Sequence, residues 1–115
     1  MQNISYPKNY FENTNANSIL MLSIEQKNID LFKYLLTKKI NTEYKNKDGN
    51  TALLYAIYLG DPYFVKKLIR YNANVNVLNK NKCSPLLVAL SLKNNEIINL
   101  LIKNGADANL ERCVF

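Results

Sequence analysis

Few side chains in this sequence could do chemistry, because its 115 residues include no histidine and only two cysteines, Cys83 and Cys113. The lack of histidine removes the commonest general base, the histidine-activated nucleophiles and the commonest zinc ligand. The cysteines form no Cys-x-x-Cys pair and are too few for a disulfide framework. No glycine-rich phosphate loop or pair of catalytic carboxylates is found either. We therefore predict no catalysis, no cofactor and no bound metal, in a reducing, cytoplasmic setting.

The basic side chains are the other candidates, since the formal net charge is +6 and the pI is about 9.3. Thirteen of the fifteen basic residues are Lys, and Asn, Ile and Tyr are also frequent. These residue types have A/T-rich codons, and Arg is favoured over Lys for bidentate phosphate contacts. We therefore attribute most of the Lys excess to codon bias and do not expect nucleic acid as the main partner.

Membrane and export signals are lacking in the sequence. Residues 1–17 have no apolar core of the kind that a secretory signal contains. Uncharged stretches such as 50–60 and 83–92 are much shorter than the roughly 20 residues that span a bilayer. We therefore expect a protein with no membrane partner.

The elements that must position these side chains repeat along the chain with a period of 33 residues. Residues 51–57 align with 84–90, and the more divergent stretch 18–24 falls on the same positions. The chain is accordingly divided into an N-terminal segment (1–17) and three copies (18–50, 51–83 and 84–115), the last with a short tail. Such a period is typical of a stack of small helical units.

Two short helices and an extended turn are predicted within each copy. Ser84-Pro85 and Asp61-Pro62 each place an N-capping residue before the proline that is favoured at the first helical position. In the middle copy the helices are expected at about 52–59 and 62–71. Gly105 supplies a permissive position after the last helix. Segments such as 75–82 are predicted to form projecting turns or hairpins.

These motifs resemble the ankyrin repeat family over about residues 13–109. The likeness lies in the 33-residue period, the starts Thr-Ala-Leu-Leu-x-Ala (51–56) and Ser-Pro-Leu-Leu-x-Ala (84–89), and the closing Asn-Gly-Ala-Asp-Ala-Asn (104–109). The resemblance implies an all-α solenoid of helix-turn-helix units with projecting tips. It also implies a rigid surface that binds a protein partner, as a scaffold or competitor, without chemistry.

The sequence departs from the family pattern at two positions. The histidine of the family's Thr-Pro-Leu-His element is replaced by Met21, Leu54 and Leu87, so its hydrogen bond near the helix start is lost. The glycine between the helices survives only as Gly60, and the other copies have Lys at 27 and 93. The Asn, Lys and Ile bias is similar to that of ankyrin proteins from host-associated bacteria and large DNA viruses. No sequence feature indicates delivery into a host cell.

Apolar residues at equivalent sites predict packing between copies. They are Leu20, Leu53 and Leu86, the small residues Ser23, Ala56 and Ala89, and the pairs Leu35-Leu36, Leu68-Ile69 and Leu101-Ile102.

Partner contacts are predicted on the surfaces that this shared framework leaves exposed, which are the turn tips and the ends of the first helices. The candidates are Lys47, Asp48, Asn50, Lys80, Asn81 and Cys83 at the tips, and Tyr58, Leu59, Ser91 and Leu92 at the helix ends. Tyr58 and Leu59 would be the apolar anchor, with Lys47 and Lys80 as its polar rim. The alternative for Tyr58 is that it only covers the groove. Cys83 is expected to expose its thiol.

The middle copy has a net charge of +4, since five basic residues stand against Asp61. Three of them, Lys66, Lys67 and Arg70, share one face of the second helix. They could be a solvated outer face, a site for an acidic protein, or, less readily, a nucleic-acid site.

The ends of a repeat array need polar caps. Tyr6, Tyr10 and Phe11 could cover the first copy, whereas the tail after Asn109 offers no comparable cap. Leu90 and Leu100 should therefore be partly uncovered. This end could be a binding site or a self-association surface, or the chain could be an inert fragment of a longer array.

Overall fold

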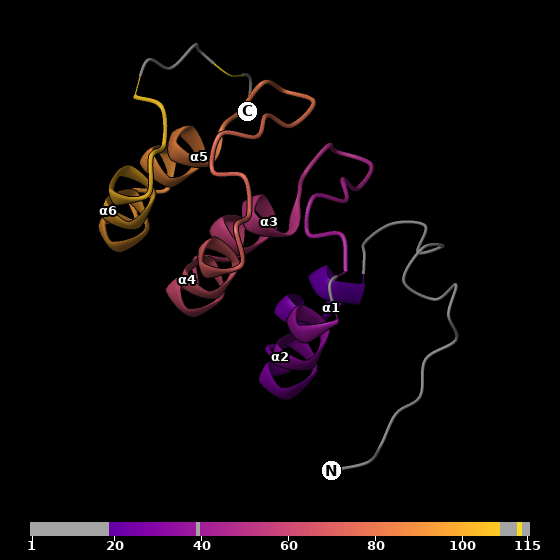
Figure 1. The fold of residues 1–115 in the computed structure, drawn as a ribbon. Coiled ribbons are helices and arrows are strands. Elements are labelled where there is room, and N and C mark those ends of the chain that lie inside the picture. The colour runs from indigo at the N-terminus through magenta and orange to yellow at the C-terminus, as the bar shows by residue number, and fades with distance from the viewer. Residues whose placement is uncertain (1–18, 39, 109–112, 114–115) are drawn as a thin grey trace.

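The computed structural model describes residues 19–38, 40–108 and 113, and within them the chain forms three helix-turn-helix pairs that stack side by side (Figure 1). The pairs are α1 (Ile19–Glu25) with α2 (Ile29–Thr37), α3 (Ala52–Leu59) with α4 (Pro62–Arg70), and α5 (Pro85–Ser91) with α6 (Asn95–Lys103). The helices α1, α3 and α5 lie next to the projecting tips, and α2, α4 and α6 lie on the side away from them (Figure 1). The fold is the all-α solenoid that was predicted.

The helix starts predicted at Asp61-Pro62 and Ser84-Pro85 are confirmed, and Thr51 caps α3 in the same way. The side chains of Thr51 and Ser84 accept a hydrogen bond from the backbone N–H three residues later, and Asp61 accepts one from the N–H of Tyr63. Proline occupies the first turn of α4 and α5. The predicted helix at 52–59 is confirmed, whereas α4 ends one residue earlier than predicted, with Tyr71 as its C-cap.

The turn inside each pair needs a residue in the left-handed region of backbone space. Gly60 has φ 78°, and the Lys residues at the equivalent positions, 27 and 93, have φ 52° and 56°. Gly105 takes the left-handed conformation directly after the C-cap of α6, as its sequence context predicted. The backbone thus keeps one geometry in all three copies even where the glycine has been lost.

The core runs along the stack between neighbouring pairs. Ser23, Ala56 and Ala89 are fully buried, so the three helices next to the tips (α1, α3 and α5, the inner helices) can approach one another closely. Phe32 of α2 and Phe64 of α4 meet edge to face, with ring centroids 4.8 Å apart. Met21 and Leu54 are buried where the family pattern has histidine, so apolar packing replaces the lost hydrogen bond there.

The predicted packing residues are buried except Ile69, which is half-buried, and Ile102 in the last copy. Leu35, Leu68 and Leu101 are fully buried, but Ile102 is 55% exposed, so the expectation that it packs between copies is wrong. No described helix pair follows α6, which leaves this position uncovered. Leu90 is 46% exposed and Leu100 half-buried, as predicted for this end.

The predicted N-terminal cap, with Tyr6, Tyr10 and Phe11, lies outside the described residues. Among the helices that the structure does describe, none is both long enough and apolar enough to cross a membrane.

Candidate partner-binding surface

The tip between the first two pairs is built around the side chain of Asn46. Its Oδ1 accepts hydrogen bonds from the backbone N–H groups of Asp48 and Asn50, both at 3.0 Å. Two backbone hydrogen bonds, Asn46 N to Asn50 O and Gly49 N to Asn46 O, close the same turn. A short amide side chain thus fixes a turn in which its neighbours Lys47 and Asp48 are exposed.

The second tip repeats this construction 33 residues later around Asn79. Its Oδ1 accepts from the backbone N–H groups of Asn81 (2.9 Å) and Cys83 (3.1 Å). The backbone hydrogen bonds Asn79 N to Cys83 O and Lys82 N to Asn79 O correspond to those of the first tip. Lys82 occupies the position of Gly49 with φ 62°. The predicted tips are therefore turns, and no strand occurs in the described part of the chain.

The two tips are hydrogen-bonded to each other. The backbone N–H of Lys80 donates to the carbonyl of Asp48 at 3.1 Å, and the Asn79 amide donates to Asn50 Oδ1 at 2.9 Å. Gly49 is needed at this contact, because a Cβ there would lie 2.7 Å from the backbone nitrogen of Lys80. The tips consequently form one continuous edge.

Asn79 also joins this edge to the end of α3. Its side-chain nitrogen lies 3.3 Å from the hydroxyl of Tyr58, to which it donates, and the Asn79 side chain is 8% exposed. Tyr58 itself remains 40% exposed, and Leu59 beside it 49%. In the next repeat Ser91 and Leu92 occupy the positions of Tyr58 and Leu59 and are also exposed.

The exposed residues of this region form what we call the tip surface. It comprises Lys47, Asp48, Tyr58, Leu59, Lys80, Asn81, Ser91 and Leu92, all exposed and all among the predicted contacts. The predicted contact Asn50 is half-buried and bonded to Asn79, so it serves to hold the tips. Leu78, 49% exposed directly before the second tip, was not predicted. An apolar residue within a polar turn segment was the sequence signal that could have indicated its exposure.

Cys83 was predicted to be exposed, but the structure places it in the interior. Its side chain is fully buried, and its sulfur is bonded to that of Cys113, 30 residues away. The Cα atoms are 4.8 Å apart, a separation usual for disulfides. The expectation of an exposed thiol is therefore wrong.

Tyr55 and Glu25 link the first two pairs on the inner helices. Burial of the Tyr55 ring, followed by the charge of the Glu25 carboxylate and a hydrogen bond to it, raises the pKa of the Tyr55 hydroxyl. The phenol donates this hydrogen bond to the Glu25 carboxylate. This contact links α1 to α3.

A metal site was not predicted. No cluster of three or more His, Cys, Asp or Glu side chains able to hold a metal ion occurs among the residues with a described placement.

The comparisons with known proteins agree with this architecture. A sequence model of ankyrin repeats, three copies long, matches residues 4–79 and, in a second overlapping match, 20–112. A comparison with curated proteins gives no match. The family matches extend over most of the chain and include all three helix pairs. The chain therefore belongs to the ankyrin repeat family.

Proposed function

We propose that this chain is a protein-interaction module whose tip surface binds one protein partner. Ankyrin repeats are in general protein–protein interaction modules. Within that general role, the partner would contact the tips and the ends of the inner helices. The proposed function includes no catalytic step.

The observation that carries the proposal is the side chain of Asn79. It is buried, and its four hydrogen bonds reach both tips and Tyr58 of α3. Binding costs less when the contacting groups are already held in place, because less conformational freedom is lost on association. The Asn79 amide holds the tips and Tyr58 in one arrangement before any partner arrives.

The composition of the tip surface also suits a protein partner. Tyr58 and Leu59 give an adjacent aromatic and aliphatic pair, each about half exposed. Charged side chains of both signs, Lys47, Asp48 and Lys80, are exposed on the tips, to which Asn79 connects Tyr58. An apolar centre with a polar rim is the common plan of protein interfaces, and aromatic residues are enriched among the side chains that contribute most affinity.

The test is a comparison of immobilised wild-type and variant chains. Proteins retained from a lysate by the wild type are identified, purified and titrated against Tyr58→Ala, Leu59→Ser and Lys80→Glu. We expect at least one purified partner whose Kd rises about tenfold or more in the two apolar variants, the equivalent of about 1.4 kcal/mol. Lys80→Glu should alter mainly the salt dependence of the association rate.

The matched control is Ile102→Ser, because Ile102 is as exposed as Leu59 but lies on α6, away from the tips. Its effect on Kd should be under twofold. Partners that bind all variants equally well would contradict the assignment to the tip surface.

A further inference from the structure

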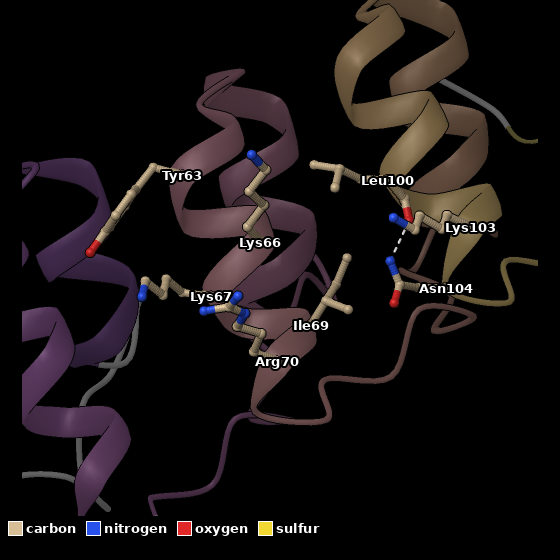
Figure 2. A pocket seen from close by; sticks show the side chains of 8 residues that line it. All are labelled: Tyr63, Lys66, Lys67, Ile69, Arg70, Leu100, Lys103 and Asn104. Carbon is tan, nitrogen blue, oxygen red and sulfur yellow. Dashed lines mark hydrogen bonds between the residues drawn. The ribbon is translucent and has the colours of Figure 1, made fainter.

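A second concave region lies between the outer helices α4 and α6 and does not involve the tips. Its volume is ≈ 460 Å³. Figure 2 shows the side chains that line it. Ile69 and Leu100 lie between α4 and α6, whereas Tyr63 and Lys67 extend from α4 on the side away from α6. The lining residues are Tyr63, Lys66, Lys67, Ile69, Arg70, Leu100, Lys103 and Asn104, which we call the α4–α6 groove.

Positive charge dominates this groove. Lys66, Lys67 and Arg70 come from α4, and Lys103 comes from α6 (Figure 2). Among the described residues, no carboxylate lines it. The Lys67 ammonium lies over the Tyr63 ring, 5.8 Å from its centroid, whereas Lys66, Arg70 and Lys103 are exposed. Like charges on one surface repel one another, and an anion placed among them would relieve that repulsion.

The floor of the groove is apolar, and the residue type at one of its positions differs between the three copies. Ile69 and Leu100 project toward each other from the two helices (Figure 2). The positions equivalent to Leu100 in the first two copies hold Tyr34 and Lys67, so the framework accepts polar and charged residues there. An aliphatic side chain at this position is therefore available for contact with a ligand.

We propose that the α4–α6 groove binds an acidic segment of a protein. Its carboxylates would pair with Lys66, Arg70 and Lys103, and one aliphatic side chain of the segment would lie on Ile69 and Leu100. A nucleic-acid backbone would satisfy the charges, but its phosphates and sugars carry no aliphatic side chain for the floor. Arg, the residue that nucleic-acid sites favour, also occurs only once among the four cations.

This site is separate from the tip surface, because the outer helices lie on the opposite side of the stack (Figure 1). The two proposals can therefore fail independently. No residue of the α4–α6 groove belongs to the tip surface, so groove variants leave the tips unchanged.

The experiment measures fluorescence anisotropy of a labelled short peptide of Asp and Glu with one central leucine, at low salt. We expect binding to the wild-type chain that weakens about tenfold in the double variant Lys66→Glu/Arg70→Glu, because two attractions become repulsions. Leu100→Asn, or serine in place of the leucine of the peptide, should weaken binding by about threefold to tenfold.

A matched control is available one repeat earlier. Lys33 occupies the position in α2 equivalent to Lys66, and Lys33→Glu/Lys38→Glu makes the same change of net charge at two exposed sites outside the groove. Its Kd should stay within about twofold of the wild-type value, which separates a local site from general attraction to a basic protein. Far-ultraviolet circular dichroism of each variant confirms that the helices are retained.

Three results would overturn the proposal. The first is no binding of the peptide to the wild-type chain at low salt. The second is an equal loss of affinity in the α2 control and the groove variant. The third is tighter binding of a single-stranded oligonucleotide than of the peptide, with log Kd linear in log salt, which would assign the groove to nucleic acid.

Discussion

The second and third helix pairs share one sequence template but differ in what surrounds them. Ile57 of α3 is fully buried, whereas Leu90, its counterpart in α5, is 46% exposed. Ile69 of α4 is half-buried, and its counterpart Ile102 of α6 is 55% exposed. In a repeat array each unit buries its apolar face against its neighbour. Burial at these positions is therefore set by the next helix pair, and a repeat motif alone does not determine it.

The largest expected difference between the two pairs comes from the same substitution at equivalent positions. Ile57→Asp should abolish the cooperative urea unfolding transition, because an unpaired carboxylate at a fully buried site costs about 4–5 kcal/mol or more. Leu90→Asp should cost about 1 kcal/mol or less, since its side chain is already half exposed. Both are measured by circular dichroism.

The control for these two substitutions is to repeat the unfolding measurements at several protein concentrations. If Leu90 is covered by a second copy of the chain in solution, the wild-type midpoint will rise with concentration, and Leu90→Asp will remove that rise. If Leu90→Asp destabilises the chain as much as Ile57→Asp at all protein concentrations, the exposure of this face would be contradicted.

The third pair has a covalent link that the second lacks. Cys83 is bonded to Cys113, whereas the residue equivalent to Cys83 in the preceding copy is Asn50. Closing a loop of this length typically stabilises a fold by about 2–4 kcal/mol. Cys113→Ser should lower the free energy of unfolding by about that amount.

The control for the disulfide is reduction. Dithiothreitol should destabilise the wild-type chain to the level of Cys113→Ser and have no further effect on the variant. Thiol titration of the unfolded chain before and after reduction gives the number of free thiols. A wild-type midpoint unaffected by reduction would show that the link contributes no stability.

A smaller effect is expected from the asparagines that build the tips. Asn79→Ala should cost about 2 kcal/mol, because it leaves the buried amide of Cys83 without its side-chain acceptor and removes the bonds to Asn50 and Tyr58. Asn46→Ala should cost about 1 kcal/mol, since the Asn46 tip is less buried and water can replace the lost acceptor. The measurement is urea unfolding.

Asn79→Asp separates the two roles of this amide. The carboxylate still accepts from the N–H groups of Asn81 and Cys83, but it no longer donates to Asn50 or Tyr58. The stability of Asn79→Asp should lie between those of Asn79→Ala and the wild type. If Asn79→Asp is only as stable as Asn79→Ala, the stabilisation comes from the hydrogen bonds to Asn50 and Tyr58 and not from those within the tip.

The helices could be predicted from the sequence because their signals are local. Asp61-Pro62 and Ser84-Pro85 set helix starts within a few residues, and a fixed period transfers the result to all copies. The loss of the family glycine at residue 93 was also visible. Only the structure shows that Lys93 keeps the left-handed backbone.

Apart from the exposed Leu78, the features that sequence reasoning missed join residues far apart in the chain. Cys83 and Cys113 are 30 residues apart, and neither has a neighbour that indicates pairing. Asn79 was placed in the predicted turn segment 75–82 but was given no role of its own, yet it links two tips and α3. Lys66 and Arg70 were recognised as one helix face, but the groove also needs Leu100 and Lys103 from the next copy. Such sites depend on how neighbouring copies stack.

The smallest effect is expected from exchanging the residue types at Gly60 and Lys93, which occupy equivalent backbone positions in the second and third helix pairs. An L-residue in the left-handed region costs about 1–2 kcal/mol, partly offset by the greater chain entropy that glycine loses on folding. Lys93→Gly should therefore stabilise the chain by about 0.5–1 kcal/mol, and Gly60→Lys should destabilise it by a similar amount. Gly60 has room for the change, because the nearest atom to an added Cβ is 3.8 Å away. Urea midpoints measured at constant protein concentration would resolve both shifts. If Lys93→Gly instead lowers the midpoint, the Lys93 side chain contributes more to stability than its backbone conformation costs.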